Sequence, residues 1–169
     1  MAPVATTFFF YFLSALTVFS GVLVITRKNP VHSALALIVS LLGQAALYLM
    51  LYAPFVAGVQ IILYAGGIMV LFLFVIMLVN IEKSQKEDQF NKQWLVGLAA
   101  AVALGVLFVL VYIKGKGLFP DRAIQMPEQS NTQQVAVLLY GDYMLAFEIA
   151  SLLLLVAVIG AVVMAKKRI

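Results

Sequence analysis

Hydrophobic residues fill five long segments of this chain, and short polar stretches separate them. A helix needs roughly 20 predominantly apolar residues to cross a bilayer, and a helix satisfies its own backbone hydrogen bonds within lipid. The pattern therefore predicts an all-α integral membrane protein with five transmembrane helices in a single membrane domain. The expected spans within residues 1–169 are about 6–25, 31–52, 56–80, 93–113 and 143–164.

The connections between the segments carry local signals of their own. Asn29 and Pro30 precede the second segment and are typical of an N-cap and a first helical position. The longest polar stretch is 114–142, and within it Gln133–Leu139 predicts a short surface helix. Asp142 precedes the fifth segment and is expected to cap it.

The third segment carries two adjacent glycines, Gly66 and Gly67, near its middle. Each weakens a helix by roughly 1 kcal/mol relative to alanine, so both need a reason. Either they permit close packing of a neighbouring helix, or they let the backbone leave the regular ladder for a wider π-turn. Gln60 and Tyr64 precede them four residues apart, a spacing that places both on one helix face. The residues alone leave both explanations open.

Polar side chains recur inside two other segments. Ser40, Gln44 and Tyr48 share one face of the second, and Glu148 and Ser151 share one face of the fifth. Polar groups in a span face protein rather than lipid, so we expect the face of Ser40, Gln44 and Tyr48 to point into protein. An ionised carboxylate at a span centre costs roughly 2.5–3.5 kcal/mol on insertion scales. Glu148 therefore reaches the interface, pairs with a partner subunit, or serves proton transfer.

The fourth segment carries no candidate chemistry. Trp94 begins it at the expected membrane–water boundary, where tryptophan is enriched. Gly97, Ala101 and Gly105 repeat every four residues. Such a face of small residues predicts close approach of a neighbouring helix.

Composition narrows the class of protein further. The chain is 64% hydrophobic and 11% charged, whereas soluble domains are roughly 45–50% apolar and 25% charged. It has no cysteine and one histidine, His32, so neither a disulfide nor a thiolate or multi-histidine metal site is expected within it. The net charge of +4 resides in loops and at the C-terminus, which does not indicate nucleic-acid binding. With no phosphate-binding loop or catalytic triad, the chain fits a subunit of a larger membrane assembly.

The basic residues also predict an orientation in the bilayer. With five spans, the first and third loops and the C-terminus lie on one side and hold eight of the Lys and Arg residues, against three on the other. Because loops rich in Lys and Arg stay in the cytoplasm, the C-terminus is expected to be cytoplasmic and the N-terminus periplasmic. No basic residue precedes the first span, so a cleavable signal peptide is not expected.

Three stretches resemble a known family. They are NPVHSALALIVSLLGQAALYL at 29–49, VQIILYAGGIMVLFLFVIMLVN at 59–80 and YGDYMLAFEIASLLLLVAVIGAVVMA at 140–165. They resemble the J subunit (NuoJ-like, mitochondrial chain 6) of bacterial NADH:quinone oxidoreductase, respiratory complex I. The similarity covers nearly the whole chain and is weakest over 93–135. Family members typically carry Tyr-Ala-Gly-Ala at the positions of residues 64–67, so in this chain Gly67 replaces the final alanine.

The resemblance implies a membrane-arm subunit that itself binds no redox cofactor. The holo-complex it implies uses NADH, FMN, iron–sulfur clusters and quinone. The implied partners are the quinone-site and antiporter-like subunits and the lipid bilayer, and the implied location is the bacterial inner membrane.

The resemblance also implies a gate. In the family the third helix switches between a π-bulged and a regular form, and this opens or closes a hydrated path between the quinone site and the antiporter-like subunits. The bulge carried onto this chain comprises Tyr64, Ala65, Gly66, Gly67 and Ile68. One extra residue rotates the following side chains by about 100°, so Met69, Phe72 and Leu73 would swing into or out of the path.

Two other functions remain open on the sequence. One is a subunit of a multi-subunit cation/proton antiporter, and the other is a purely structural spacer. Co-purification of flavin and iron–sulfur subunits separates complex I from an antiporter. Substitutions at Gly66 and Gly67 that impair assembly without altering turnover would indicate a spacer.

Overall fold

The computed structural model describes residues 4–79, 93–115 and 130–166 of the chain. Within these ranges all regular structure is helical: α1 Val4–Thr26, α2 Pro30–Met50, α3 Pro54–Val59, η1 Gln60–Ile68, α4 Met69–Leu78, α5 Trp94–Gly115, α6 Asn131–Tyr140 and α7 Met144–Ala165. The segments α3, η1 and α4 follow one another without a break and are called the third helix below. Five helices are long and apolar enough to cross a membrane, which confirms the predicted fold class.

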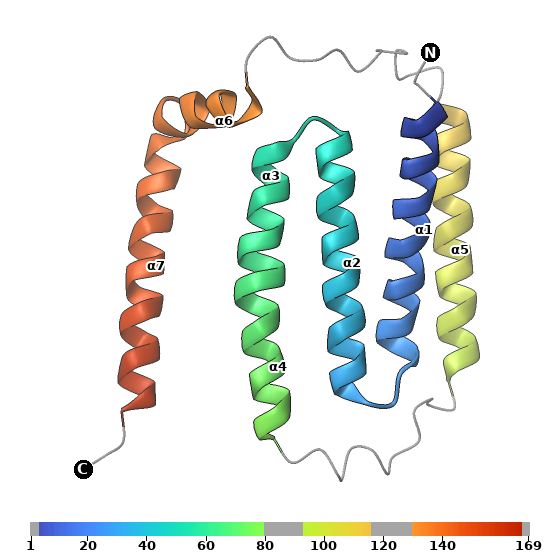
Figure 1. Cartoon of the computed structure of the whole chain (residues 1–169), viewed down its shortest axis with the longest axis horizontal. Helices are drawn as coiled ribbons and strands as arrows, with labels where there is room; N and C mark the ends of the chain where they lie inside the picture. Colours follow the sequence, from blue (N-terminus) through green and yellow to red (C-terminus); the bar gives the residue numbers. More distant parts are fainter. Residues whose placement is uncertain (1–3, 80–92, 116–129, 167–169) are drawn as a thin grey trace.

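Helices α1, α2 and the third helix lie side by side, with α2 in the middle (Figure 1). Small and hydroxyl-bearing residues form the contact between α1 and α2. The Ser40 hydroxyl donates a hydrogen bond to the Thr17 carbonyl at 3.3 Å, and a Cβ on Gly43 would clash with the Thr17 hydroxyl. Ser20 is also buried in this contact region of the chain. Small residues thus let the two backbones approach closely, as in many membrane helix pairs.

The ends of α2 show how the sequence directs its boundaries. As predicted, Asn29 caps the helix, because its Oδ1 accepts the Val31 N–H at 2.9 Å and Pro30 follows at the first position. The helix ends at Met50, two residues before the predicted end of that span. Tyr52 has a φ of 57°, and the Ala53 N–H donates to the Tyr48 carbonyl at 3.0 Å. This left-handed ending satisfies the last carbonyls and turns the chain directly into Pro54.

A short helix, α6, precedes α7 in the chain and includes the predicted surface helix. It extends from the start of α7 toward the start of α3 (Figure 1) and contacts both α3 and α7. At one end the Asn131 Oδ1 accepts the Phe55 N–H at 3.4 Å. At the other end the rings of Tyr140 and Phe147 meet edge to face at 5.3 Å. The prediction that Asp142 caps α7 is wrong, because Tyr143 occupies the cap position and makes no side-chain cap bond.

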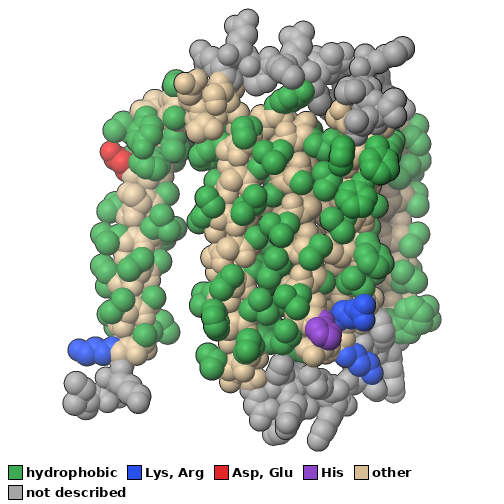
Figure 2. All heavy atoms as spheres, viewed as in Figure 1, with side chains coloured by type: hydrophobic (Ala, Val, Ile, Leu, Met, Phe, Trp, Pro, Cys, Tyr) green, Lys and Arg blue, Asp and Glu red, His purple; other side chains and the backbone are tan. Residues whose placement is uncertain are grey.

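Helices α5 and α7 stand apart from the three packed helices. Within the described ranges, α5 makes no close backbone contact with another helix, and α7 makes one only with α6. Figure 2 shows open space between α7 and the third helix, with hydrophobic side chains along α7. A methyl group on Gly97 or Gly105 would meet no other atom within 4 Å. The small-residue face of α5 therefore has no partner among the described residues, and lipid or other chains must cover these two helices in the membrane.

Candidate functional site: the wide turn of the third helix

The middle of the third helix is a π-helical turn that covers Gln60–Ile68. Its end is marked by the Met69 N–H, which donates to the Tyr64 carbonyl five residues earlier instead of four. The predicted bulge is therefore present, and it includes all five residues expected for it. It begins at Gln60, four residues before the predicted start at Tyr64.

The spacing of buried positions along the third helix shows that the wide turn contains one residue more than a regular helical turn. In a regular helix the buried positions recur at steps of three or four. Here the step from Gln60 to Ala65 is five, and both residues are 8% exposed. The inward-facing positions are Ala57, Gln60, Ala65 and Met69, which are buried, and Leu73 and Ile76, which are partly buried.

Straightening the wide turn would exchange the residues that face α2. With regular spacing from Ala57, the inward positions would be Tyr64 and Ile68 in place of Ala65 and Met69, since each later residue would turn by about 100°. Tyr64 and Ile68 are now 48% and 55% exposed, whereas Met69 is 4% exposed. The wide turn also explains why Tyr64 does not share the buried face of Gln60, contrary to the four-residue spacing argument.

Two of the polar residues predicted to share one face of the second span, Gln44 and Ser40, contact different neighbouring helices. Gln44 accepts a hydrogen bond at Oε1 from the Gln60 Nε2, with 3.1 Å between the two atoms. Ser40 instead faces α1 through its bond to Thr17. Tyr48 is partly buried. The structure thus joins Gln44 to Gln60 at the start of the wide turn, a pairing that residue spacing within either helix does not reveal.

The two glycines differ in what a side chain would meet. A Cβ on Gly66 would lie 3.2 Å from the Ile61 carbonyl oxygen, whereas a Cβ on Gly67 would lie 3.7 Å from the Ile62 carbonyl oxygen. The first distance is crowded and the second is ordinary van der Waals contact. Both atoms belong to the wide turn itself, and no other described helix lies within 4 Å. Within this chain, the glycines therefore accommodate the backbone of the turn and do not pack against another helix.

The residues predicted to line a path fall on two faces of α4. Met69 is buried and Leu73 is partly buried, so both lie on the inward face. Phe72 is exposed. With regular spacing Phe72 would take the place of Leu73, so this pair exchanges positions when the register shifts.

Glu148 and Ser151 are not brought to the wide turn. Both are exposed on α7, and the Ser151 hydroxyl donates to the backbone carbonyl of Glu148 at 2.7 Å, not to its carboxylate. Among the described residues none bonds to that carboxylate. No group of three or more metal-ligating side chains occurs in the part of the chain that the structure describes.

A chain of apolar spanning helices, with a polar pair at the start of one π-helical turn, defines a multi-pass membrane protein whose distinctive element is the wide turn of the third helix. Residues 20–164 match the family NADH-ubiquinone/plastoquinone oxidoreductase chain 6, and the chain belongs to this family.

Relatives from bacteria and an archaeon match over nearly the full length. NADH-quinone oxidoreductase subunit J of Pseudomonas aeruginosa is 39% identical, over 91% of this chain and 93% of its own length. The subunit of the same name in Escherichia coli K12 is 37% identical, over 91% of this chain and 83% of its own. F(420)H(2) dehydrogenase subunit J of Methanosarcina mazei is 36% identical, over 93% and 89%. The chain is accordingly a multi-pass protein of the inner membrane.

Proposed function

We propose that this chain is the J-type membrane-arm subunit of a proton-translocating NADH:quinone oxidoreductase and carries no redox centre itself. The family match and the relatives at 36–39% identity over most of the chain support this assignment. The complex supplies NADH, FMN, iron–sulfur and quinone chemistry through its other subunits. The neighbours we expect are the quinone-site and antiporter-like subunits.

The names of the relatives separate the role of this chain from the electron donor. Two of them are named for oxidation of NADH, and the archaeal one is named for F(420)H(2). A subunit that is common to enzymes with different electron donors acts in the membrane and does not bind the donor. This supports a role within the membrane, and we propose that the third helix, which carries the wide turn, performs it.

The mechanism we propose is gating of a hydrated path by a change of register in the third helix. The observation that carries it is the five-residue step from Gln60 to Ala65 on the buried face. In the wide form, Ala65 and Met69 face inward. In the straight form Tyr64 and Ile68 replace them, and a bulky ring then occupies the place of a methyl group. Such a replacement changes the space open to a water chain, and apolar bulk in that space stops proton transfer.

The gate requires two forms of similar free energy. A switch operates when the minor form lies within a few kcal/mol of the major one. Gly66 and Gly67 remove the side chains that would crowd the wide turn, and no backbone residue within it is forced to a positive φ. The hydrogen bond between Gln44 and Gln60 holds the start of the wide turn against α2. A change of register therefore rotates the residues that follow Gln60.

The orientation we propose places the C-terminus in the cytoplasm and the N-terminus in the periplasm. It rests on the eight-to-three distribution of Lys and Arg between the two sides and on the preference of basic loops for the cytoplasm. A reporter enzyme fused after Ile169 tests it. Cytoplasmic activity is the expected result, and periplasmic activity would contradict the orientation.

Purification of the tagged chain from its native membrane tests the assignment to the complex. Flavin-containing and iron–sulfur subunits should co-purify, and the preparation should oxidise NADH. Recovery of antiporter subunits without a flavoprotein would instead support the antiporter alternative.

The variant Gly66→Val tests the gate, because Val adds bulk at Cβ and stiffens χ1. It should leave NADH oxidation by artificial acceptors nearly intact and lower quinone turnover in the assembled complex.

A further inference from the structure

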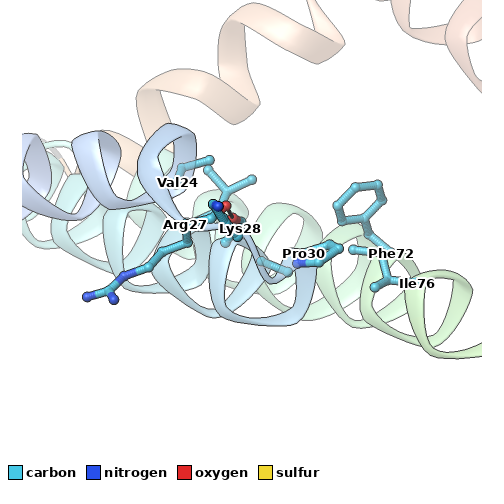
Figure 3. Close-up of a pocket in the computed structure, with 9 residues that line it drawn as sticks. Val24, Arg27, Lys28, Pro30, Phe72 and Ile76 are labelled. Carbon is cyan, nitrogen blue, oxygen red and sulfur yellow. Dashed lines mark hydrogen bonds between the residues drawn. The ribbon is translucent and has the colours of Figure 1, made fainter. Parts of the chain in front are cut away.

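A cavity of about 360 Å³ lies where the turn between α1 and α2 meets α4 (Figure 3). Its volume is within the usual range for small-molecule sites, roughly 300–1,000 Å³. The lining combines apolar side chains with two cationic residues, and the guanidinium of Arg27 is turned away from Phe72 and Ile76 (Figure 3). The residues that line it are Val24, Arg27, Lys28, Pro30, Ser33, Ala34, Leu37, Phe72 and Ile76.

The charged end of this cavity lies at a helix boundary. Arg27 and Lys28 follow the last residue of α1 and precede α2, the position at which a spanning segment leaves the hydrocarbon. Figure 2 shows the basic and histidine side chains gathered at this end of the packed helices. The acidic residues within the described ranges, Asp142 and Glu148, belong to the α6–α7 region and do not pair with them.

The opposite end of the α1–α2 pair provides an internal comparison. A cavity of about 380 Å³ there is lined by Thr6, Thr7, Phe10, Tyr11, Leu47, Met50 and Leu51. It is similar in size but has no charged residue. The two cations therefore distinguish the cavity at Arg27 and Lys28 from this uncharged one.

We propose that this cavity binds an anionic phospholipid of the surrounding leaflet. The phosphate lies against Lys28, and the long side chain of Arg27, which is turned away in this structure (Figure 3), turns toward the same headgroup. An acyl chain lies along Val24, Leu37, Phe72 and Ile76. Basic pockets between transmembrane helices are the sites where anionic headgroups bind. The Ser33 hydroxyl is already used, since it donates to the Arg27 carbonyl at 3.3 Å, so the two cations carry headgroup recognition.

Photolabelling of the purified, assembled complex tests the site directly. The probes are a phosphatidylglycerol and a phosphatidylcholine, each with the same photoreactive group in one acyl chain. Labelled peptides are then mapped on this chain. We expect phosphatidylglycerol to label the peptides that contain Val24, Leu37 and Phe72, and to do so several-fold more strongly than phosphatidylcholine.

The charge requirement is tested by Arg27→Gln together with Lys28→Gln. Removing two basic residues near the membrane surface should lower phosphatidylglycerol labelling at these peptides by about tenfold or more. Lys166→Gln is the matched control, because Lys166 follows α7 and does not line the cavity; it should leave the labelling unchanged. Ile76→Trp tests the acyl lining: it fills the groove without altering charge and should also lower the labelling.

Two results would overturn the proposal. One is equal labelling by both probes that the double variant does not change, which would describe unselective contact with bulk lipid. The other is absence of label on these peptides in an assembled complex that is labelled elsewhere, which would show that protein covers the cavity. Because the readout is lipid binding and not turnover, failure of the gating mechanism leaves this test unaffected.

Discussion

The side-chain amide of Gln60 on the third helix donates a hydrogen bond to Oε1 of Gln44 on α2, with 3.1 Å between the heavy atoms. Gln60 is also the last inward-facing residue before the five-residue step to Ala65. The bond therefore fixes the helix on the upstream side of the wide turn. Residues after the turn can rotate while those before it remain paired to α2.

Removing one partner of this pair should cost more than removing both. Gln44→Leu leaves the buried Gln60 amide without its partner, and an unsatisfied buried polar group costs about 1–3 kcal/mol. Gln44→Leu combined with Gln60→Leu removes both polar groups, so the double variant should regain stability. The measurement is the half-life of quinone-reductase activity of the purified complex at elevated temperature. If the double variant loses activity as fast as the combined effects of the two single variants predict, the two amides act independently.

Asn131 acts as a cap supplied from a distant segment. Its Oδ1 accepts the Phe55 N–H, which the start of α3 leaves open because Ala53 provides no side-chain cap. The contact is long, 3.4 Å, so Asn131→Ala should cost about 0.5–1 kcal/mol, near the lower end for a hydrogen bond. Asn131→Asp keeps the acceptor and adds a negative charge near a helix N-terminus, which is favourable.

The two Asn131 variants are compared by the amount of assembled complex on a native gel after mild heating. The alanine variant should lose complex earlier than wild type, and the aspartate variant should not. Equal losses in both variants would show that side-chain bulk at the start of α6, and not the hydrogen bond to α3, is what matters.

Glu148 is expected to meet a polar group of another subunit. It is exposed within the second turn of α7, and no described residue bonds to its carboxylate. Burial of an unpaired charge in the membrane is costly, so the assembled complex must hydrate or pair it. Glu148→Gln should assemble and should lower proton-coupled quinone reduction. Wild-type turnover and pumping stoichiometry in Glu148→Gln membranes would leave Glu148 as an interfacial residue without a role in coupling.

The sequence predicts most of the fold because the rules that set it are local. Span length comes from the thickness of the bilayer, and the cap at Asn29 comes from its side-chain oxygen. The two glycines alone leave close packing and a wide turn both open, and the bulge is predicted by the family resemblance. The end of α2 was placed two residues late because Tyr52, which is not a glycine, adopts the left-handed ending. The cap of α7 is Tyr143, one residue after the predicted Asp142, because the start of the helix at Met144 has no signal in the sequence.

The site was harder to predict because it depends on contacts between helices. The wide turn begins at Gln60, where the bond to Gln44 holds the helix, and that pairing joins residues 16 positions apart. The four-residue spacing of Gln60 and Tyr64 assumes regular geometry, which the bulge removes. The small-residue face of α5 and the carboxylate of Glu148 have no partner among the described residues, since these surfaces look toward lipid or other chains.

The matched pair Gly66→Ala and Gly67→Ala tests the gating account most directly, with proton pumping per quinone reduced and quinone turnover measured in vesicles that contain assembled complex. Both variants add one methyl group and improve helix propensity equally. Only the methyl at 66 crowds a carbonyl of the wide turn, at 3.2 Å against 3.7 Å. Relieving that contact by backbone distortion costs about 1 kcal/mol, which alters the ratio of the two forms roughly fivefold. The account predicts that Gly66→Ala lowers quinone turnover and pumping several-fold, with NADH oxidation by artificial acceptors unchanged, and that Gly67→Ala behaves as wild type. Normal pumping by assembled Gly66→Ala enzyme, or an equal loss in both variants, would contradict it.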